Sequence, residues 1–382
     1  METIKNQKRW LFLFILLLGN QLTFSQSIND NLSDNLQDIK ICKWKNAAIA
    51  CIDFSFDDNN RSHKKISKIL DEYGYKATFF VISSYMFTDS LTSMVKNGHE
   101  IGNHTYSHPD LPTLDSINID YQIRKGKELI ENKLGVKCVS FAEPGHQKNA
   151  LSTRTAFKYH LFIRNYSEYP EIGEHPRIPY TGMTIDKLNT AIQTALKSGS
   201  ILQIAGHGMD GEGYEPVTES FFRQTLDLVK DYQTKYNIWI VPIREGVLYE
   251  DLYHEITLDK KQINDTLLIN FNNFNATKYK DLDSCMISVE IPNKIFKKIS
   301  SLTDNVRMIE LKDKYVLTTD LNKNINLKVK LDSVDSKYNI DSINSVDSPR
   351  LSYVQIRPNP IRNVLNIISP YPILKTEIFN LD

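Results

Sequence analysis

The sequence predicts an α/β fold: a parallel β-sheet wrapped by helices, either a barrel or an open doubly wound sheet, followed by a small β-rich domain. Residues 46–56 (NAAIACIDFSF) form a continuous apolar run, which is typical of a strand covered on both faces. Strand-like and helix-like segments then alternate regularly as far as residue 243. Beyond about Tyr253 the long helices stop, and short β-type runs follow between Asn, Asp and Lys turns.

Each segment of the alternating region carries its own signal. The predicted strands are short apolar runs at residues 46–56, 77–82, 137–144, 161–167, 200–208 and 238–243. The predicted helices have helical apolar spacing or helix-forming composition, at residues 61–75, 91–98, 116–134, 152–160, 184–199 and 217–236. Gly74, Gly135 and Gly199 mark helix ends, and Thr184 is predicted to cap the helix that follows it. Function in such folds lies at the carboxyl ends of the strands.

Residues 1–25 have the pattern of a secretory signal peptide. Lys5, Lys8 and Arg9 precede the apolar run 10–19, and a polar stretch that ends in TFSQ follows it. This run is about half as long as a membrane-spanning helix requires, and no other segment is apolar and long enough to span a membrane. The sequence therefore predicts an exported protein, secreted or at the cell surface, whose mature chain has no membrane span.

The rest of the chain divides into four predicted parts. The α/β domain occupies residues 45–252, and an accessory β-rich domain follows at 256–332. Residues 333–350 are polar and are predicted to form a linker. The last part, 351–382, returns to alternating β character.

The charge balance and the cysteine content exclude some classes of function. Lys+Arg and Asp+Glu both count 46, so the formal net charge is zero. This balance does not provide the broad cationic surface that non-specific nucleic-acid binding needs, and we expect no nucleic-acid partner. The four cysteines include no Cys-x-x-Cys spacing, which argues against a thiolate zinc site.

Two pairs of polar residues are the candidates for chemistry. Asp57 and Asp58 follow the apolar run 46–56, where two charges are costly unless a cation or hydrogen-bond donors compensate them. His104 and His108 are four residues apart, and a helical turn between them would aim both rings the same way. One carboxylate and two imidazoles make a facial ligand set that suits Zn²⁺, with other divalent ions as alternatives. The second carboxylate is then free to act as a base.

His207 lies between Gly206 and Gly208 at the end of a predicted strand, where the glycines allow a ligand to approach closely. It is the candidate for a general acid that protonates a leaving group. The alternative is a loop histidine without a chemical role. The sequence assigns no role to four further histidines: His146, His160, His175 and His254.

The order of FDD at 56–58, NHTYSHP at 103–109, FAEPGH at 141–146 and ILQIAGHG at 201–208 resembles the polysaccharide deacetylase family. This family is also called the NodB-homology or carbohydrate esterase family 4 domain. The resemblance covers roughly residues 45–250. It implies an irregular (β/α) barrel, often with seven strands, and a hydrolase that removes N- or O-acetyl groups from a polysaccharide or oligosaccharide.

The resemblance also implies a role for each site residue. Asp57 would be the general base, and His207 the general acid. The ligands of a divalent metal, with Zn²⁺ favoured, would be Asp58, His104 and His108. In the family mechanism the base deprotonates a metal-activated water, which attacks the acetyl carbonyl, and the acid protonates the departing amine or alcohol.

The sequence departs from the family pattern at two places. Asn59 stands where the first motif usually has glycine, and Ala142 stands where the third motif usually has the arginine that pairs with the catalytic aspartate. Arg177 is a candidate substitute partner for Asp57, and Arg177 and Pro144 are candidate substrate-binding residues. The loss of the arginine leaves open a barrel that binds sugar without catalysis. A hydrolase of a non-sugar amide is the second alternative, because related barrels also act on small C–N substrates.

The segment RPNP at 357–360, with the alternating apolar residues after it, resembles the sorting domain of the type IX secretion system. This resemblance implies that the type IX machinery is a partner. The usual I-x-N-x-x-G ending is missing before Asp382, so the domain at 351–382 is predicted to be truncated. The alternative is an ordinary edge β-hairpin.

Overall fold

A computed structural model of the chain describes residues 36–166, 175–293, 296, 298–331 and the backbone of 355–359 and 364–368. The chain divides into two compact units, Met1–Val334 and Asp335–Asp382. The predicted signal peptide and linker lie outside the described residues. Within the part of the chain that the structure describes, no helix has the length and apolar character needed to cross a membrane.

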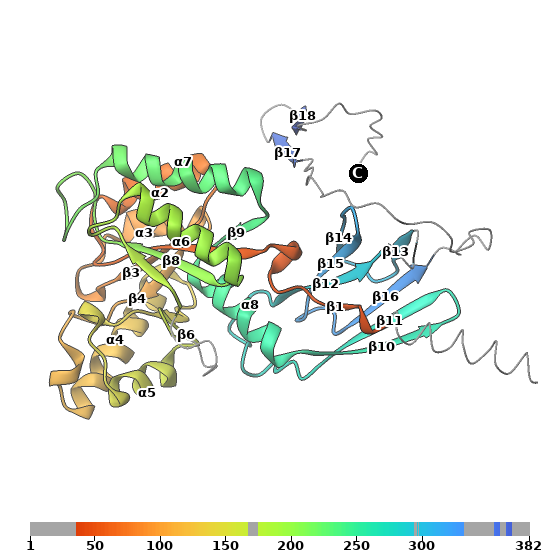
Figure 1. The fold of residues 1–382 in the computed structure, drawn as a ribbon. Coiled ribbons are helices and arrows are strands. Elements are labelled where there is room, and N and C mark those ends of the chain that lie inside the picture. Colours follow the sequence, from red (N-terminus) through yellow and green to blue (C-terminus); the bar gives the residue numbers. More distant parts are fainter. Residues whose placement is uncertain are drawn as a thin grey trace, which may run out of the picture. The chain divides into compact units, whose positions relative to one another are not determined.

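An eight-stranded sheet forms the centre of the α/β part of the first unit (Figure 1). Its strand order is β6-β5-β4-β3-β2-β8-β7, and β9 also pairs with β2. All these pairings are parallel. The strands are β2 (Ala50–Phe56), β3 (Thr78–Val81), β4 (Glu100–Asn103), β5 (Ser140–Phe141), β6 (Phe162–Ile163), β7 (Arg177–Pro179), β8 (Ile201–Gly206) and β9 (Ile238–Ile240). The sheet is curled, so the predicted irregular barrel is confirmed, with eight strands rather than seven.

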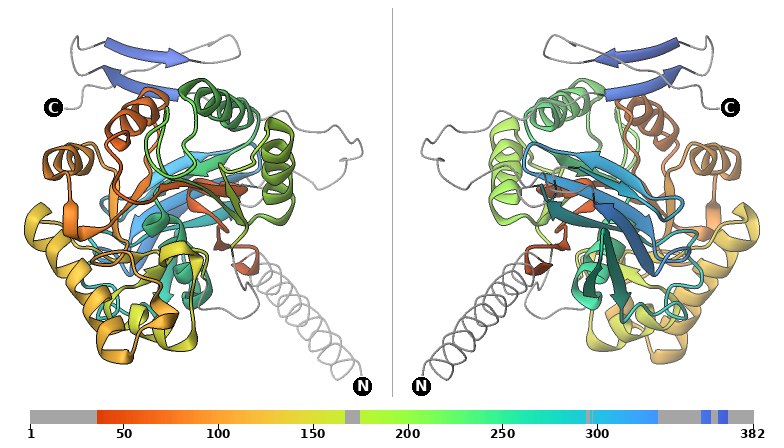
Figure 2. Two further views of the ribbon diagram at one scale, coloured as in Figure 1. Left: turned by 90° about the vertical axis from the view of Figure 1, so that its left-hand side faces the viewer. Right: turned by 90° about the vertical axis from the view of Figure 1, so that its right-hand side faces the viewer.

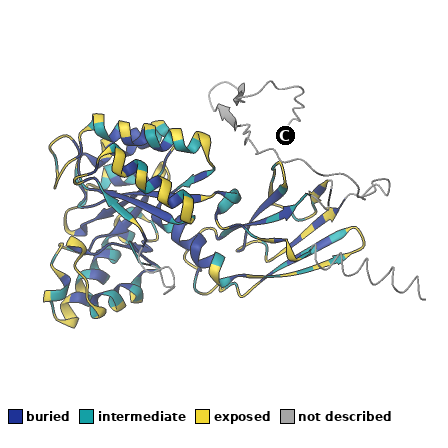
Figure 3. Ribbon diagram, in the orientation of Figure 1, coloured by how far each residue is buried: buried dark blue, intermediate teal, exposed yellow. Residues whose placement is uncertain are grey.

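Helices surround the curled sheet (Figure 2). They are α2 (His63–Tyr73), α3 (Thr88–Lys96), α4 (Ser116–Leu134), α5 (Ala150–Tyr159), α6 (Ile185–Ser198) and α7 (Glu219–Lys235). All seven residues of β2 are buried, as expected for a strand with a covered face on each side. The outer faces of α6 and α7 are exposed, whereas their inner faces are buried against the sheet (Figure 3).

Local signals set the two ends of α6 as the sequence predicts, and a further cap that was not predicted begins α4. The Thr184 side chain accepts a hydrogen bond from the Lys187 amide at the start of α6. Gly199 ends the same helix with φ 65°, a left-handed conformation that favours glycine. Asp115 caps α4 by accepting a hydrogen bond from the Asn118 amide.

One helix was not predicted. The sequence predicts a strand over 238–243, but β9 ends at Ile240 and α8 (Ile243–Glu255) begins directly after Pro242. Most of α8 is buried, including the acidic residues Glu250 and Asp251, so it lacks the polar face by which an amphipathic helix is recognised.

The β-rich part of the first unit contains two four-stranded antiparallel sheets. Their strand orders are β1-β12-β15-β14 and β10-β11-β16-β13. The strands are β1 (Lys40–Ile41), β10 (Thr257–Ile263), β11 (Thr266–Asn272), β12 (Met286–Pro292), β13 (Ile299–Ser301), β14 (Arg307–Glu310), β15 (Lys314–Asp320) and β16 (Asn326–Leu331). Apolar side chains of both sheets belong to one buried cluster, as in a β-sandwich. The predicted β-rich region is present, and β1 adds to it a strand from before the α/β domain.

In the second unit the described backbone forms an antiparallel pair, β17 (Gln355–Asn359) with β18 (Val364–Ile368). The rest of the segment 351–382 lies outside the described residues. The sorting domain therefore stays a prediction.

Candidate metal centre and active site

Asp57 and Asp58 follow β2 directly, at the carboxyl end of the parallel sheet. Asp58 has φ 75° and Asn59 has φ 55°, so the chain turns sharply after the strand. The Asn60 side chain stabilises this turn by donating a 3.0 Å hydrogen bond to the Asp57 carbonyl oxygen. The asparagine that stands where the family has glycine thus adopts a left-handed conformation, which asparagine tolerates better than most residues.

His104 and His108 belong to the loop after β4, at the same edge of the sheet. The prediction of a helical turn between them is wrong. The structure has instead a loop in which Thr105 has φ 69° and His108 has φ 61°. The Thr105 hydroxyl accepts a 2.9 Å hydrogen bond from the His108 amide and fixes the loop. The two rings still converge, with their centroids 4.9 Å apart.

Asp58, His104 and His108 form a compact cluster of potential metal ligands. Asp58 Oδ1 lies 3.6 Å from His104 Nε2 and 3.5 Å from His108 Nε2. A tetrahedral zinc ion with bonds of about 2.0–2.1 Å would hold its ligand atoms roughly 3.3 Å apart, close to these distances. Among the described residues, Asp58 Oδ1 is buried without a hydrogen-bond partner. A buried carboxylate oxygen that faces two imidazole nitrogens fits a bound divalent cation.

The ring of His104 is held by the backbone of Ala142. His104 Nδ1 lies 2.8 Å from the Ala142 carbonyl oxygen, so a proton on Nδ1 satisfies this contact and leaves Nε2 free to bind a metal. His104 is 1% exposed, and burial lowers the pKa of its imidazole. The residue at the place of the missing arginine therefore positions a metal ligand through its main chain.

Arg164 makes a bidentate ion pair with Asp57 across the interior of the curled sheet. Arg164 Nη1 lies 2.6 Å from Asp57 Oδ1, and Nη2 lies 2.7 Å from Oδ2. Arg164 follows β6 and is 2% exposed, and its guanidinium also lies over the Phe80 ring. The prediction that Arg177 pairs with Asp57 is wrong, because Arg164 occupies both carboxylate oxygens.

This pair controls the protonation of Asp57. Burial alone would raise the pKa of the carboxyl group, but the adjacent Arg164 guanidinium, together with His104 and His207, more than offsets this effect. The pKa of Asp57 therefore lies well below its usual range. An ionised carboxylate next to a metal site can accept a proton from water.

His207 follows β8 and lies near the same site. Its backbone carbonyl oxygen accepts a 2.8 Å hydrogen bond from the Nε2 of buried His63. The Tyr214 ring packs edge-on against the His207 ring, with centroids 5.1 Å apart. His207 and Asp57 line one small cavity, so the structure brings the predicted acid and base together.

Arg177 and Pro144, the two predicted substrate-binding residues, are placed differently. Arg177 lines the cavity that contains Asp57 and His207, where its guanidinium contacts the His146 ring. Pro144 is buried in the turn after β5 and is not among the residues that line this cavity. Arg177 can therefore meet a ligand directly, whereas Pro144 shapes the turn.

A second cavity, which we call the Asp58 cavity, lies on the metal-ligand side. It has a volume of about 520 Å³ and is lined by Asp58 and His108 together with Tyr85, Phe87 and polar residues. This volume falls within the roughly 300–1,000 Å³ of known ligand pockets. The metal cluster therefore borders a space large enough for a substrate.

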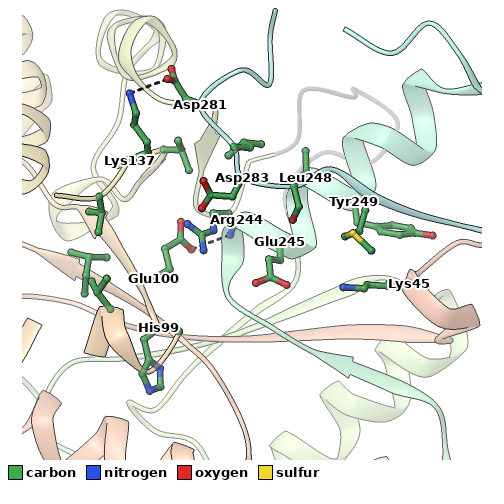
Figure 4. A pocket seen from close by; sticks show the side chains of 18 of the residues that line it. Lys45, His99, Glu100, Lys137, Arg244, Glu245, Leu248, Tyr249, Asp281 and Asp283 are labelled. Atoms are coloured by element: carbon green, nitrogen blue, oxygen red, sulfur yellow. Dashed lines mark hydrogen bonds and ion pairs between the residues drawn. The ribbon is translucent and has the colours of Figure 1, made fainter. Parts of the chain in front are cut away.

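A third cavity, of about 400 Å³, lies where the α/β part meets the β-rich part (Figure 4). It contains Glu100, the first residue of β4, and thus lies at the end of the sheet opposite to the metal cluster. Glu100 accepts hydrogen bonds from the Thr78 and Ser140 hydroxyls and from the Arg244 amide. The cavity contains side chains of both charges and none of the predicted catalytic or metal residues, so we assign it to the junction of the two parts.

Sequence reasoning missed Arg164, the Ala142 carbonyl oxygen that accepts a hydrogen bond from His104, and the aromatic residues Tyr85 and Phe87 of the Asp58 cavity. Arg164 could have been found by the same signal that identified Asp57, because each is a charged residue directly after an apolar run. The contact of the Ala142 carbonyl oxygen with His104 had no such signal, because every residue type has the same main-chain carbonyl group.

The family comparison agrees with this geometry. Residues 45–161, which include the metal cluster and Asp57, match the family model described as Polysaccharide deacetylase. This match supports a polysaccharide deacetylase domain in this part of the chain. The match covers less than half of the chain and ends before Arg164 and His207.

Individual relatives match the deacetylase domain over short stretches. The Bacillus subtilis protein YlxY, itself described as uncharacterized, is 39% identical over 87 residues, which are 22% of this chain and 27% of that protein. A chitin deacetylase of a Pestalotiopsis species is 34% identical over 119 residues, 29% of this chain and 40% of that enzyme. The chain thus spans less than half the length of these relatives.

Solved structures match the chain at lower identity. A carbohydrate esterase family 4 pseudoenzyme of Bacillus anthracis has a TM-score of 0.40 and 19% identity, over 52% of this chain and 65% of that one.

Proposed function

We propose that this chain is a metal-dependent carbohydrate deacetylase that hydrolyses N- or O-acetyl groups of a polysaccharide or oligosaccharide. One observation supports this proposal above the others: Asp58, His104 and His108 converge beside an ionised Asp57 within a deacetylase domain. The Arg164 pair also argues against the alternative of an impaired barrel, because the base keeps a guanidinium partner.

Each residue then has a defined task. A divalent cation, with Zn²⁺ favoured, would polarise the acetyl carbonyl and make water more acidic when held by Asp58 and the two histidines. Asp57 accepts the proton of the attacking water, and Arg164 orients Asp57 and keeps it ionised. His207 donates a proton to the departing nitrogen or oxygen of the sugar.

Acetate release from acetylated fragments of chitin, peptidoglycan and xylan tests the proposal. We expect release from at least one of these substrates, and loss of release both with EDTA and in Asp57→Asn. If none yields acetate while a small amide is cleaved, the enzyme is a hydrolase of another class. If no substrate is cleaved and Asp57→Asn changes no property, the chain is not an enzyme of this type.

We also propose that the protein is exported, through the leader at 1–25 and then the type IX machinery, to the cell surface or the medium. The basic and apolar leader and the RPNP segment support this proposal. The test compares the full chain with a variant that lacks 351–382, in a host with the type IX system. Equal amounts of both proteins in the medium would contradict the sorting role.

A further inference from the structure

We propose that Tyr85 and Phe87 form a stacking platform for a sugar ring, which binds a residue of the carbohydrate chain next to the one that is deacetylated. This inference rests on the proposed function and specifies how the site would recognise a chain rather than a single sugar. Both aromatic side chains line the Asp58 cavity, together with two of the three metal ligands.

The first support is the exposure of these rings. Tyr85 is 52% exposed and Phe87 is 36% exposed, which places them with Tyr121, Tyr214 and Tyr236 among the strongly exposed aromatic side chains of the described α/β domain. Two exposed rings that line one cavity offer an apolar surface that a ligand can cover. The carbon-bound hydrogens on one face of a pyranose ring match such a surface in size and polarity.

The second support is the connection of the platform to the metal centre. The Tyr85 hydroxyl donates a hydrogen bond to the Asp58 carbonyl oxygen at 3.4 Å, and the Asn59 side chain donates one to the Tyr85 carbonyl oxygen at 2.8 Å. The turn that contains Tyr85 also bonds to the histidine loop, because the Ser84 amide donates to the Tyr106 carbonyl oxygen at 2.9 Å. A ring bound on Tyr85 would therefore have a fixed position relative to the metal ligands.

The third support is the polar rim of the same cavity. Asn60, Ser107 and Glu212 supply amide, hydroxyl and carboxylate groups around the aromatic rings. The Arg61 guanidinium also lines the cavity and lies over one face of the Phe87 ring, 5.3 Å from its centroid. Apolar faces surrounded by hydrogen-bonding groups suit a carbohydrate, whose rings present both kinds of surface, better than an apolar peptide.

Binding is tested in the full chain with Asp57→Asn as the background, so that turnover cannot interfere. The probes are tetrasaccharides of N-acetylglucosamine, of peptidoglycan and of acetylated xylose, measured by isothermal titration calorimetry. In this background Tyr85→Ala and Phe87→Ala should each weaken the tightest probe by about tenfold, the loss expected for one stacking contact. Tyr85→Phe keeps the ring and should retain most of the affinity. Tyr236→Ala, an exposed tyrosine at the end of α7, is the matched control.

Kinetics with Asp57 intact separates binding from catalysis. Phe87→Ala should raise the KM for the best tetrasaccharide by about tenfold, with kcat changed by less than about threefold. The factor by which Phe87→Ala raises the KM for the matching monosaccharide should be at least fivefold smaller, because a monosaccharide bound at the metal would not reach the platform.

The outcomes distinguish this inference from the proposed function. If the enzyme releases acetate but Tyr85→Ala and Phe87→Ala change neither affinity nor KM, the platform is wrong and the deacetylase proposal stands. If a tetrasaccharide binds through the platform but no acetate is released, the platform stands and the deacetylase proposal fails. Equal losses for tetrasaccharide and monosaccharide, or binding of none of the probes, would overturn the platform.

Discussion

Arg164 and Asp57 form a buried bidentate ion pair although 107 residues separate them in the chain. The pair joins the end of β6 to the end of β2, two strands that are not neighbours in the sheet. Asp57 therefore has a guanidinium partner, as it would in the family pattern. The third family motif, after β5, would normally supply this partner, whereas here it follows β6, the next strand in the chain.

Replacing Arg164 with methionine should therefore impair both catalysis and stability. Without the guanidinium the pKa of Asp57 rises, so the acid limb of the kcat/KM profile should move to higher pH. An unpaired buried carboxylate should also cost about 3–5 kcal/mol of unfolding free energy. The pH profile and urea denaturation measure the two effects.

Arg177→Met is the matched control for that experiment, because Arg177 lines the same cavity without pairing with Asp57. A larger shift of the acid limb in Arg177→Met than in Arg164→Met would contradict the assignment. The double variant Ala142→Arg with Arg164→Met asks whether a guanidinium at the usual family position can replace the native one. Partial recovery of kcat/KM would support a shared role for the two positions.

Metal content should depend on three residues. We expect about one Zn²⁺ per chain after reconstitution, and little after Asp58→Asn or His104→Gln, because each removes one of three protein ligands. Inductively coupled plasma mass spectrometry of the purified proteins measures this directly. His254→Gln, at an exposed histidine of α8, is the control and should keep its zinc. Full zinc occupancy in Asp58→Asn would exclude the proposed ligand set.

Gly126 of α4 should be required for the shape of the histidine loop. A Cβ atom at this position would meet the Asn103 side chain and lie 2.9 Å from the carbonyl carbon of Thr105. Gly126→Ala should therefore displace the loop that carries His104, cost about 1–3 kcal/mol of stability and weaken zinc binding. Thermal denaturation and zinc titration test this. Lys125→Ala on the same helix should leave the zinc affinity unchanged.

Acid should destabilise the metal-free protein through its buried histidines. Burial lowers the pKa of His160 to about 3 and that of His63 to about 4, so both are neutral in the folded state at pH 6. The unfolded chain takes up these protons below a pKa of about 6.5, so stability is highest above that pH and falls as the pH drops toward 4. Each histidine contributes a slope of at most about 1.4 kcal/mol per pH unit.

Melting temperatures between pH 7 and pH 4, in EDTA, measure this dependence. His160→Gln cannot be protonated, and it should show a shallower loss than the unmodified chain. An identical pH dependence in the two proteins would mean that His160 does not contribute.

Three of the proposed site residues could be picked out from the sequence because they stand directly after strands, and parallel strands bring their carboxyl ends to one edge. Asp57, Asp58 and His207 are of this kind. Arg164 also follows a strand, but its ion pair with Asp57 depends on the curl of the sheet, which brings β6 opposite β2. Local sequence does not determine this curl. Helix α8 was not predicted for another reason. Pro242 precedes it without a polar capping side chain, and the buried acidic residues Glu250 and Asp251 interrupt the apolar spacing by which a helix is recognised.

The pairing of β1 with β12 has a consequence for the order in which the protein folds during synthesis. Lys40 pairs with Glu290 and Ile41 with Val289, so β1 must wait for about 250 further residues before it meets its partner. At about 5–20 residues per second, this wait lasts roughly 10–50 s. The parallel sheet has all its strands once Ile240 has left the ribosome, well before β12. The α/β domain can therefore fold first, and β1, which is made before that domain, is among the last strands to find its partner.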